Sequence, residues 1–368
     1  MDYMDDFQIT TETQKVFNDL LTEATVKNAA WEKYSMGDIR FLSVKEVEPA
    51  KIEDFTSLGV YGDTSEHTQL YASLEGGKPV AIGESALLSI FGRAKIAGTA
   101  LSHLDSTFLA DLLNQCFQLW PGMLVLVYKS MLKIRAMHSN QYKPISVPAV
   151  FQAARKTFEE QFEHYQWLYG YVDHAQYIAE YEIKDDFLLD QYRTLLGVED
   201  LTANVKVVTS NTARNGINVY YNIVNRSSGL TILGNRYLMD HRRKDSLEAF
   251  KENISQTYTQ YQGAYQSMDR LASIIFLHPD NVLYEALASI NIPKKWISEV
   301  VSLHQSIAGK KSNTALSVFL SACEVLGIAA REGYGQKQLQ GLSEKVYRLK
   351  LTDLSKFDYR SKEEILAA

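Results

Sequence analysis

The feature that most constrains the fold is a change of hydrophobic period along the chain. Three segments after residue 200 alternate apolar and polar side chains between turn residues, which predicts the strands Val205–Thr209, Ile217–Val224 and Leu230–Met239. From Asp245 onward the apolar residues recur at helical spacing, and prolines such as Pro279 interrupt the pattern. We therefore expect an α+β protein with a central antiparallel β element and a helical C-terminal region.

The first two hundred residues mix both periods, which predicts a region of sheet and helix. The expected helices are Glu12–Ala24, Glu84–Ala94, Ser106–Leu119, Val150–His164 and Asp186–Leu196. The expected strands are Ile39–Val47, Leu70–Leu74, Pro79–Ile82, Leu124–Tyr128, Lys133–Met137, Trp167–Tyr171 and Gln176–Ile183. We divide the chain on this basis into an α+β region at 1–200, a basic β element at 201–244 and a helical region at 245–368.

Composition narrows the class of protein. With 46% hydrophobic and 22% charged residues the chain has the balance of a globular protein. Its two cysteines, Cys116 and Cys323, lie far apart without a CxxC motif, which excludes a secreted disulfide scaffold. The first residues are acidic where a signal peptide needs positive charge, and every apolar run is much shorter than the ~20 residues of a membrane helix. We expect a cytoplasmic protein without a membrane partner.

Basic residues are concentrated in two segments of an otherwise acidic chain, whose net charge is −6. The first basic segment, residues 112–158, has no Asp or Glu and contains Lys129, Lys133, Arg135, Lys143, Arg155 and Lys156. The second basic segment, residues 201–244, has Asp240 as its one acidic residue and contains Lys206, Arg214, Arg226, Arg236, Arg242, Arg243 and Lys244. Such segments are typical of a surface that neutralises phosphates, so we expect them to contact nucleic acid.

Tyrosines accompany these basic residues. Exposed aromatic rings between cations form a platform on which single-stranded bases stack, whereas tyrosines in strands also serve as half-buried packing. Both interpretations stay open for each ring. The tyrosines concerned are Tyr128, Tyr142, Tyr220, Tyr221 and Tyr237.

One stretch resembles a known family. Residues 135–142, Arg-Ala-Met-His-Ser-Asn-Gln-Tyr, with Ile145 after them, are similar to the RAxxSxxYxxI signature of the phage and plasmid proteins grouped as domain of unknown function 932. Ser210-Asn211 with Gly216, and later His241-Arg242, resemble two further motifs, although Asn211 stands where the family has an acidic residue. The family has no agreed activity. The resemblance implies a mobile-element origin and favours roles in DNA replication, recombination or counter-defence.

The signature itself allows two interpretations. Arg135 at a strand end with Ser139 four residues later could clamp a phosphate. Alternatively, Ser139 forms a turn that Tyr142 closes over the core. Together with the basic segments, the signature gives the candidate nucleic-acid-binding residues Lys133, Arg135, Ser139, Tyr142, Lys143, Arg214, Arg236, His241, Arg242, Arg243 and Lys244.

Catalytic chemistry finds little support in the sequence. No Walker A loop, dinucleotide fingerprint or zinc-protease motif occurs, and the eight histidines lack metal-ligand spacing. Asp185-Asp186 with Asp190 could hold Mg²⁺ in a hydrolase, or simply complement a helix N-terminus. Asp240-His241 could act as an acid–base pair, or mark an exposed strand end. We assign no catalytic residue, no metal and no cofactor.

The sequence therefore predicts a non-enzymatic, phage- or plasmid-encoded protein that binds nucleic acid. Single-stranded DNA is the expected ligand, bound or annealed during recombination in the host cytoplasm, and a homo-oligomer is an expected assembly. Two alternatives stay open. One is a protein-binding module that counters a host defence factor, and the other is an unrecognised hydrolase or nuclease.

Overall fold

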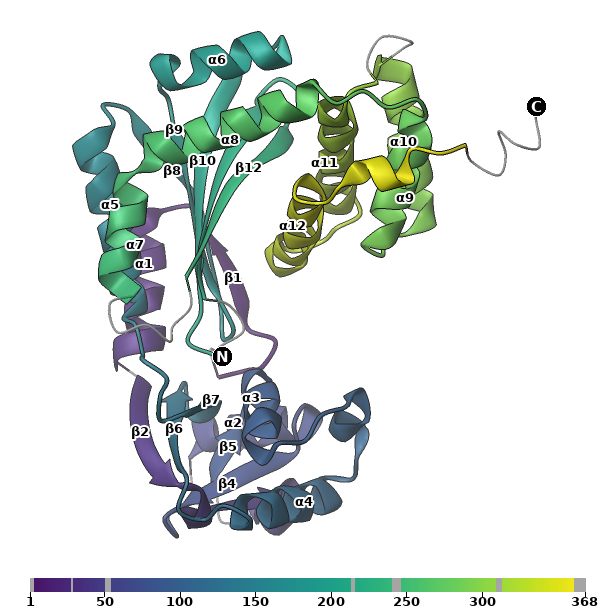
Figure 1. The fold of residues 1–368 in the computed structure, drawn as a ribbon. Coiled ribbons are helices and arrows are strands. Elements are labelled where there is room, and N and C mark those ends of the chain that lie inside the picture. The colour runs from purple at the N-terminus through teal and green to yellow at the C-terminus, as the bar shows by residue number, and fades with distance from the viewer. Residues whose placement is uncertain are drawn as a thin grey trace.

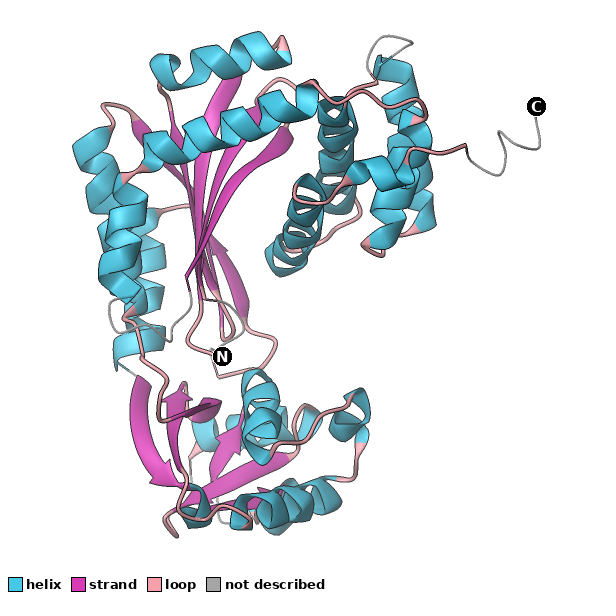
Figure 2. Ribbon diagram, viewed as in Figure 1, coloured by secondary structure: helices cyan, strands magenta, loops and turns pink. Residues whose placement is uncertain are grey.

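Two six-stranded sheets with helices packed on both faces make up the fold (Figures 1 and 2). The computed structural model describes residues 3–27, 29–49, 54–212, 216–239, 246–308 and 313–360. Within these ranges the α+β class expected from the sequence is confirmed.

Sheet A is antiparallel throughout, in the order β1-β8-β9-β10-β11-β12. Its strands are β1 (Gln8–Thr11), β8 (Tyr165–Asp173), β9 (Tyr177–Ile183), β10 (Leu201–Thr209), β11 (Ile217–Asn225) and β12 (Leu230–Met239). Because β10 is hydrogen-bonded to β9, the predicted β element at 201–244 is part of this larger sheet. The division expected at residue 200 thus does not coincide with a packing unit.

The largest hydrophobic core covers one face of sheet A. It is formed with the helices α1 (Gln14–Thr22), α5 (Val147–Gln161), α6 (Asp186–Leu196), α7 (Ser246–Ser255) and α8 (Thr257–Ala272). The opposite face lies toward α11 (Ala315–Arg331) and α12 (Gln336–Lys350), which share a second core with α9 (Pro279–Ser289) and α10 (Lys294–Ala308) (Figure 1). Alternation along a strand separates the two faces, since Tyr221 belongs to the first core and Tyr220 does not.

Sheet B is inserted between α1 and α5 and has the order β2-β6-β7-β5-β4-β3. Its strands are β2 (Ala29–Ser35), β3 (Ile39–Ser43), β4 (Leu70–Leu74), β5 (Val80–Ile82), β6 (Leu124–Ser130) and β7 (Lys133–Ser139). The helices α3 (Glu84–Ala94) and α4 (Ser106–Gln118) bury one face, and α2 (Phe55–Glu66) packs on the other. The RAxxSxxY stretch is thereby placed on β7 and the turn after it.

The length and apolarity of the helices and the state of the two cysteines were also subjects of sequence-based expectations. No helix within the described residues is both long and apolar enough to cross a membrane. Cys116 on α4 and Cys323 on α11 are free thiols, and Cys323 is buried in the core of the C-terminal helices.

Candidate nucleic-acid interface

The basic residues of the RAxxSxxY stretch are buried at the junction between the two sheets. Lys133 is 0% exposed and Arg135 is 1% exposed. Lys133 Nζ lies 3.0 Å from Asp5 Oδ2 and also contacts the Asp63 carboxylate. Arg135 donates from Nη1 to Asp5 and from Nη2 to the carbonyl oxygen of Tyr3, at 2.8 Å for the latter. The expectation that these two cations contact phosphate is corrected, because neither is exposed and both are paired inside the chain.

This ion cluster of Lys133, Arg135, Asp5 and Asp63 ties the N-terminal segment to sheet B. Burial lowers the pKa of Arg135, and the neighbouring Asp5 carboxylate opposes that shift. Asp5, Asp63 and His67 bring potential ligand atoms within 4.8 Å of one another. The ammonium group of Lys133 contacts the carboxylates of both Asp5 and Asp63. The negative charge of these two carboxylates is therefore balanced by a side chain of the protein.

Most other cations of the two basic segments also have an acidic partner. Nine of the thirteen cations lie within the described residues. Besides Lys133 and Arg135, six of these nine form ion pairs: Lys129–Glu32, Arg155–Glu159, Lys156–Glu160, Lys206–Glu180, Arg226–Glu182 and Arg236–Glu344. Arg236, a candidate binding residue, is only 18% exposed. The candidate Lys143 is exposed. The candidates Arg214, His241, Arg242, Arg243 and Lys244 lie outside the described residues.

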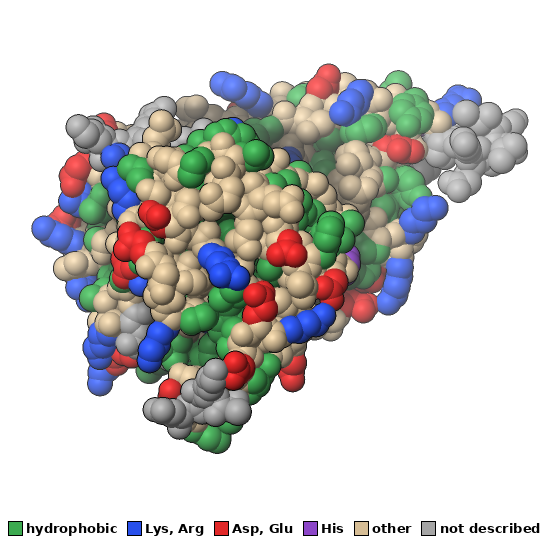
Figure 3. Space-filling view, turned by 90° about the horizontal axis from the view of Figure 1, so that it is seen from below, with side chains coloured by type: hydrophobic (Ala, Val, Ile, Leu, Met, Phe, Trp, Pro, Cys, Tyr) green, Lys and Arg blue, Asp and Glu red, His purple; other side chains and the backbone are tan. Residues whose placement is uncertain are grey.

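The pairing has a visible consequence at the molecular surface. Figure 3 views the molecule from below, where sheet B and its helices lie. On the described part of this face, Lys and Arg side chains alternate with Asp and Glu and form no continuous basic area. Among the described residues, most cations of the two basic segments are therefore balanced by acidic partners.

The two basic segments nevertheless meet in space. Asn211 follows β10 in the second segment, and its carbonyl oxygen accepts a hydrogen bond from His138 Nε2 on β7 at 3.2 Å. The Asn211 side-chain amide donates to the Tyr128 hydroxyl on β6 at 3.3 Å. Ser210 and Thr212 on either side are fixed by hydrogen bonds to the carbonyl oxygen of Ala175. The end of β10 is thus anchored against the aromatic side chains of sheet B.

Four stacked rings occupy this meeting point, and we call them the aromatic stack: Trp31, Tyr128, His138 and Tyr142. Trp31 is the cross-strand partner of Tyr128, with ring centroids 4.6 Å apart. The ring centroids of His138 and Tyr142 are 4.1 Å apart. Tyr128 and His138 are buried, whereas Trp31 and Tyr142 are half-buried. Burial raises the pKa of Tyr128 and Tyr142, so both rings remain uncharged.

The contacts of Ser139 and Tyr142 bear on the two interpretations of the RAxxSxxY signature, which were a phosphate clamp and a turn closed over the core. The amide of Tyr142 donates to the carbonyl oxygen of Ser139 at 3.0 Å, which forms the turn that the structural interpretation expected. Ser139 itself is half-buried at the end of β7. Trp31 was not among the predicted site residues, since its strand is remote from the signature and only the pairing of β2 with β6 brings the two together.

The acidic cluster proposed as a hydrolase site has a structural role. Asp185 is the N-cap of α6, and its carboxylate accepts from the amide of Leu188 at 2.9 Å. Asp186 and Asp190 both pair with Arg193 one or two turns later. These contacts correspond to the helix N-terminus interpretation. The Asp240-His241 pair lies outside the described residues.

His174, beside the ion cluster, gives the fold a predicted pH dependence. Its Nε2 donates to the carbonyl oxygen of Met4 at 2.8 Å, and burial followed by the charge of Arg135 lowers its pKa to about 2. The unfolded chain binds this proton near pH 6.5 and the folded chain does not. The free energy of unfolding should therefore fall as the pH drops below about 6.5, by up to about 1.4 kcal/mol per pH unit from this residue.

Urea unfolding of the wild type and of His174→Gln between pH 7 and pH 5 (roughly the range in which an unfolded histidine titrates) isolates this contribution. The variant should lose less stability over the interval than the wild type. Equal losses in the two proteins would show that His174 accepts its proton in the folded state.

No family model, curated protein or solved structure matches this chain.

Proposed function

We propose that the chain binds single-stranded nucleic acid at the aromatic stack. The observation that carries the proposal is the position of the half-buried rings of Trp31 and Tyr142, at the point where the two basic segments meet. Base stacking on aromatic side chains accepts any sequence, because every base has a π face, and it requires a base that is not already stacked in a duplex. This geometry favours single strands over double helices.

The proposal assigns phosphate contacts to fewer cations than the sequence predicted. Cations that are buried or paired within the chain release few counterions from a nucleic acid. Lys143 is exposed, and the proposal assigns phosphate contacts to it and to four candidates outside the described ranges: Arg214, Arg242, Arg243 and Lys244. With about five such contacts, the logarithm of the binding constant should fall against the logarithm of salt concentration with a slope of about −3.5 for single strands.

The family resemblance supports the same function. The proposed mobile-element origin is consistent with a role on the single strands that arise during replication and recombination. We propose binding rather than catalysis as the role, and one observation supports it: within the described residues, the carboxylates of the acidic candidates Asp185, Asp186 and Asp190 serve helix capping and ion pairs.

Fluorescence anisotropy of a labelled single strand, titrated at several salt concentrations, tests the proposal. Replacing Arg242, Arg243 and Lys244 together by Ala should weaken binding to every sequence alike and make the slope shallower by up to about two units. The matched control is Lys156→Ala, which removes a basic-segment cation that pairs with Glu160 on the same helix and should leave the slope unchanged.

Three outcomes are distinguishable in this titration. Absence of salt-dependent binding of the wild type at low ionic strength contradicts the proposal. Equal or tighter binding of duplex favours a purely electrostatic contact. Shortening of the strand when Mg²⁺ is added supports the nuclease alternative.

A further inference from the structure

A row of polar side chains crosses the face of sheet A that lies toward α11 and α12. Tyr169, Glu180, Lys206, Tyr220 and Arg236 stand on five successive strands, each the register partner of the next. A sheet face that helices cover is ordinarily apolar, because burial of apolar surface is what holds the layers together. Packing therefore does not account for this row.

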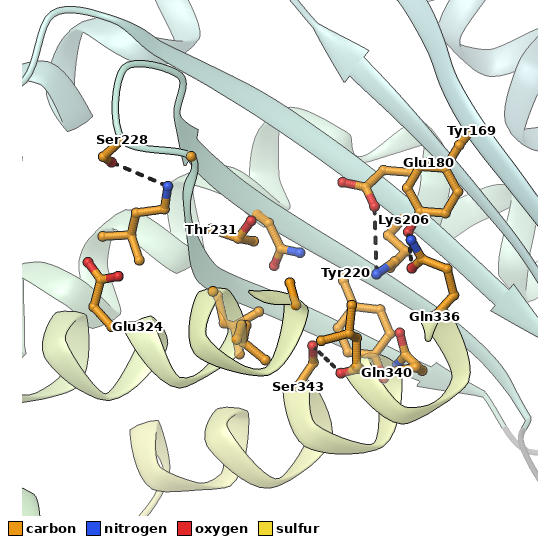
Figure 4. A pocket seen from close by; sticks show the side chains of 18 of the residues that line it. Tyr169, Glu180, Lys206, Tyr220, Ser228, Thr231, Glu324, Gln336, Gln340 and Ser343 are labelled. Atoms are coloured by element: carbon orange, nitrogen blue, oxygen red, sulfur yellow. Dashed lines mark hydrogen bonds and ion pairs between the residues drawn. The ribbon is translucent and has the colours of Figure 1, made fainter. Parts of the chain in front are cut away.

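A cavity of about 320 Å³ lies between the polar row and the two helices (Figure 4). Tyr169, Glu180, Lys206 and Tyr220 line it from the sheet, and Gln336 and Gln340 line it from α12. Figure 4 shows the side chains of Lys206, Tyr220 and Gln340 gathered at one end. Its volume is in the range of sites that hold small molecules.

Two deeply buried polar atoms of the lining have no hydrogen-bond partner among the residues that the structure describes. They are the hydroxyl of Tyr220, a residue 2% exposed, and the side-chain oxygen of Gln340, a residue 4% exposed. Buried polar atoms are nearly always hydrogen-bonded, since leaving them unsatisfied is costly. The Tyr169 hydroxyl, by contrast, donates to Gln336 Oε1 at 3.1 Å. The unpaired hydroxyl and amide oxygen are where a bound molecule would make its hydrogen bonds.

The charges around the cavity restrict the kind of molecule that fits. Lys206 Nζ lies 3.6 Å from Glu180 Oε2, and the other two charged residues of the lining, Glu324 and Arg331, are of opposite sign. Little net charge is left to hold an ionic ligand. Hydroxyl groups both donate and accept hydrogen bonds, which matches a lining that offers a phenol and an amide oxygen together.

We propose that this cavity is a binding site for a neutral, hydroxyl-rich molecule of monosaccharide size. Its hydroxyls bond to Tyr220 and Gln340, and one face of the ring lies near the aromatic rings of Tyr169 and Tyr220. The site is separate from the aromatic stack of sheet B, so it goes beyond the proposed nucleic-acid function and does not depend on it.

Isothermal titration calorimetry of the full chain with glucose, galactose, ribose and myo-inositol tests the proposal. The decisive variant is Tyr220→Phe, which removes only the unpartnered hydroxyl. It should lower the affinity for the bound probe about five- to tenfold while leaving the melting temperature unchanged or slightly higher, because a buried unsatisfied group is lost.

The neighbouring Tyr221→Phe is the matched control. Tyr221 points to the opposite face, where its hydroxyl donates to Asn253 Oδ1 at 3.0 Å. This variant should lower the melting temperature and leave the affinity for the probe unchanged. The proposal is overturned if none of the four probes binds the wild type, if Tyr220→Phe binds as well as the wild type, or if glucose 6-phosphate binds more tightly than glucose. Trp31→Ala should bind the probe normally, so the two sites fail independently.

Discussion

Replacing Asp5 by Asn is expected to lower the free energy of unfolding by about 3–5 kcal/mol, the range for breaking a buried ion pair on one side. The Asp5 carboxylate is 1% exposed and contacts both Lys133 and Arg135. Without the negative charge of Asp5, Arg135 keeps its hydrogen bond to the carbonyl oxygen of Tyr3. Lys133 keeps its contact with the Asp63 carboxylate. No other carboxylate of the described residues forms an ion pair with the buried guanidinium.

Equilibrium unfolding in urea measures this loss. The matched control is Glu160→Gln, which removes the charge of an exposed pair with Lys156 and should change stability by less than about 0.5 kcal/mol. A loss below about 1 kcal/mol for Asp5→Asn, the level of an ordinary exposed pair, would mean that water or a rearranged side chain compensates Arg135. The ion cluster would then not be a main contact between the N-terminal segment and sheet B.

Replacing Trp31 by Ala is expected to weaken single-strand binding about 5- to 150-fold, which corresponds to the ~1–3 kcal/mol of one stacked base. Trp31 presents the largest ring of the aromatic stack, and its half-buried position leaves part of that ring accessible. Trp31→Phe keeps a smaller aromatic surface and should recover part of the affinity. Anisotropy titrations at one fixed salt concentration provide the comparison.

Trp120 offers the matched control for this prediction. It is also half-buried, but it follows α4 and lies under the ammonium group of Lys95, 3.9 Å from the ring centroid. Trp120→Ala should bind the oligonucleotide like the wild type. If Trp31→Ala also binds like the wild type, the stack is a packing feature and not a platform for bases.

Local patterns predicted most strands and helices, and the elements they missed show where such patterns fail. The strands of the hairpins β6–β7 and β8–β9 were found because each has its own alternation and a turn between. The edge strand β2 was missed, because Ala29–Ser35 has little apolar alternation and is held by its pairing with β6, some ninety residues later. The helix α2 contains Gly59 and Gly62, which weaken a helical pattern.

The candidate site shows a second limit, which concerns charge. Net charge was counted over continuous segments, but ion pairs form between residues that are distant in sequence. Asp5 lies 128 residues before Lys133 and 130 before Arg135. Glu344 likewise reaches Arg236 from the C-terminal helices. A basic segment therefore indicates a basic surface only when its acidic partners are also known, and the sequence contained no signal that would pair them.

Photo-cross-linking tests the central claim most directly. A single strand that carries 5-bromouridine is bound to the wild-type chain, irradiated, and the cross-linked peptides are identified by mass spectrometry. We expect the adducts on Trp31 or Tyr142, because stacking places a base in contact with these rings. Adducts confined to peptides without either residue, or no adduct under conditions where anisotropy shows saturation, would contradict binding at the aromatic stack.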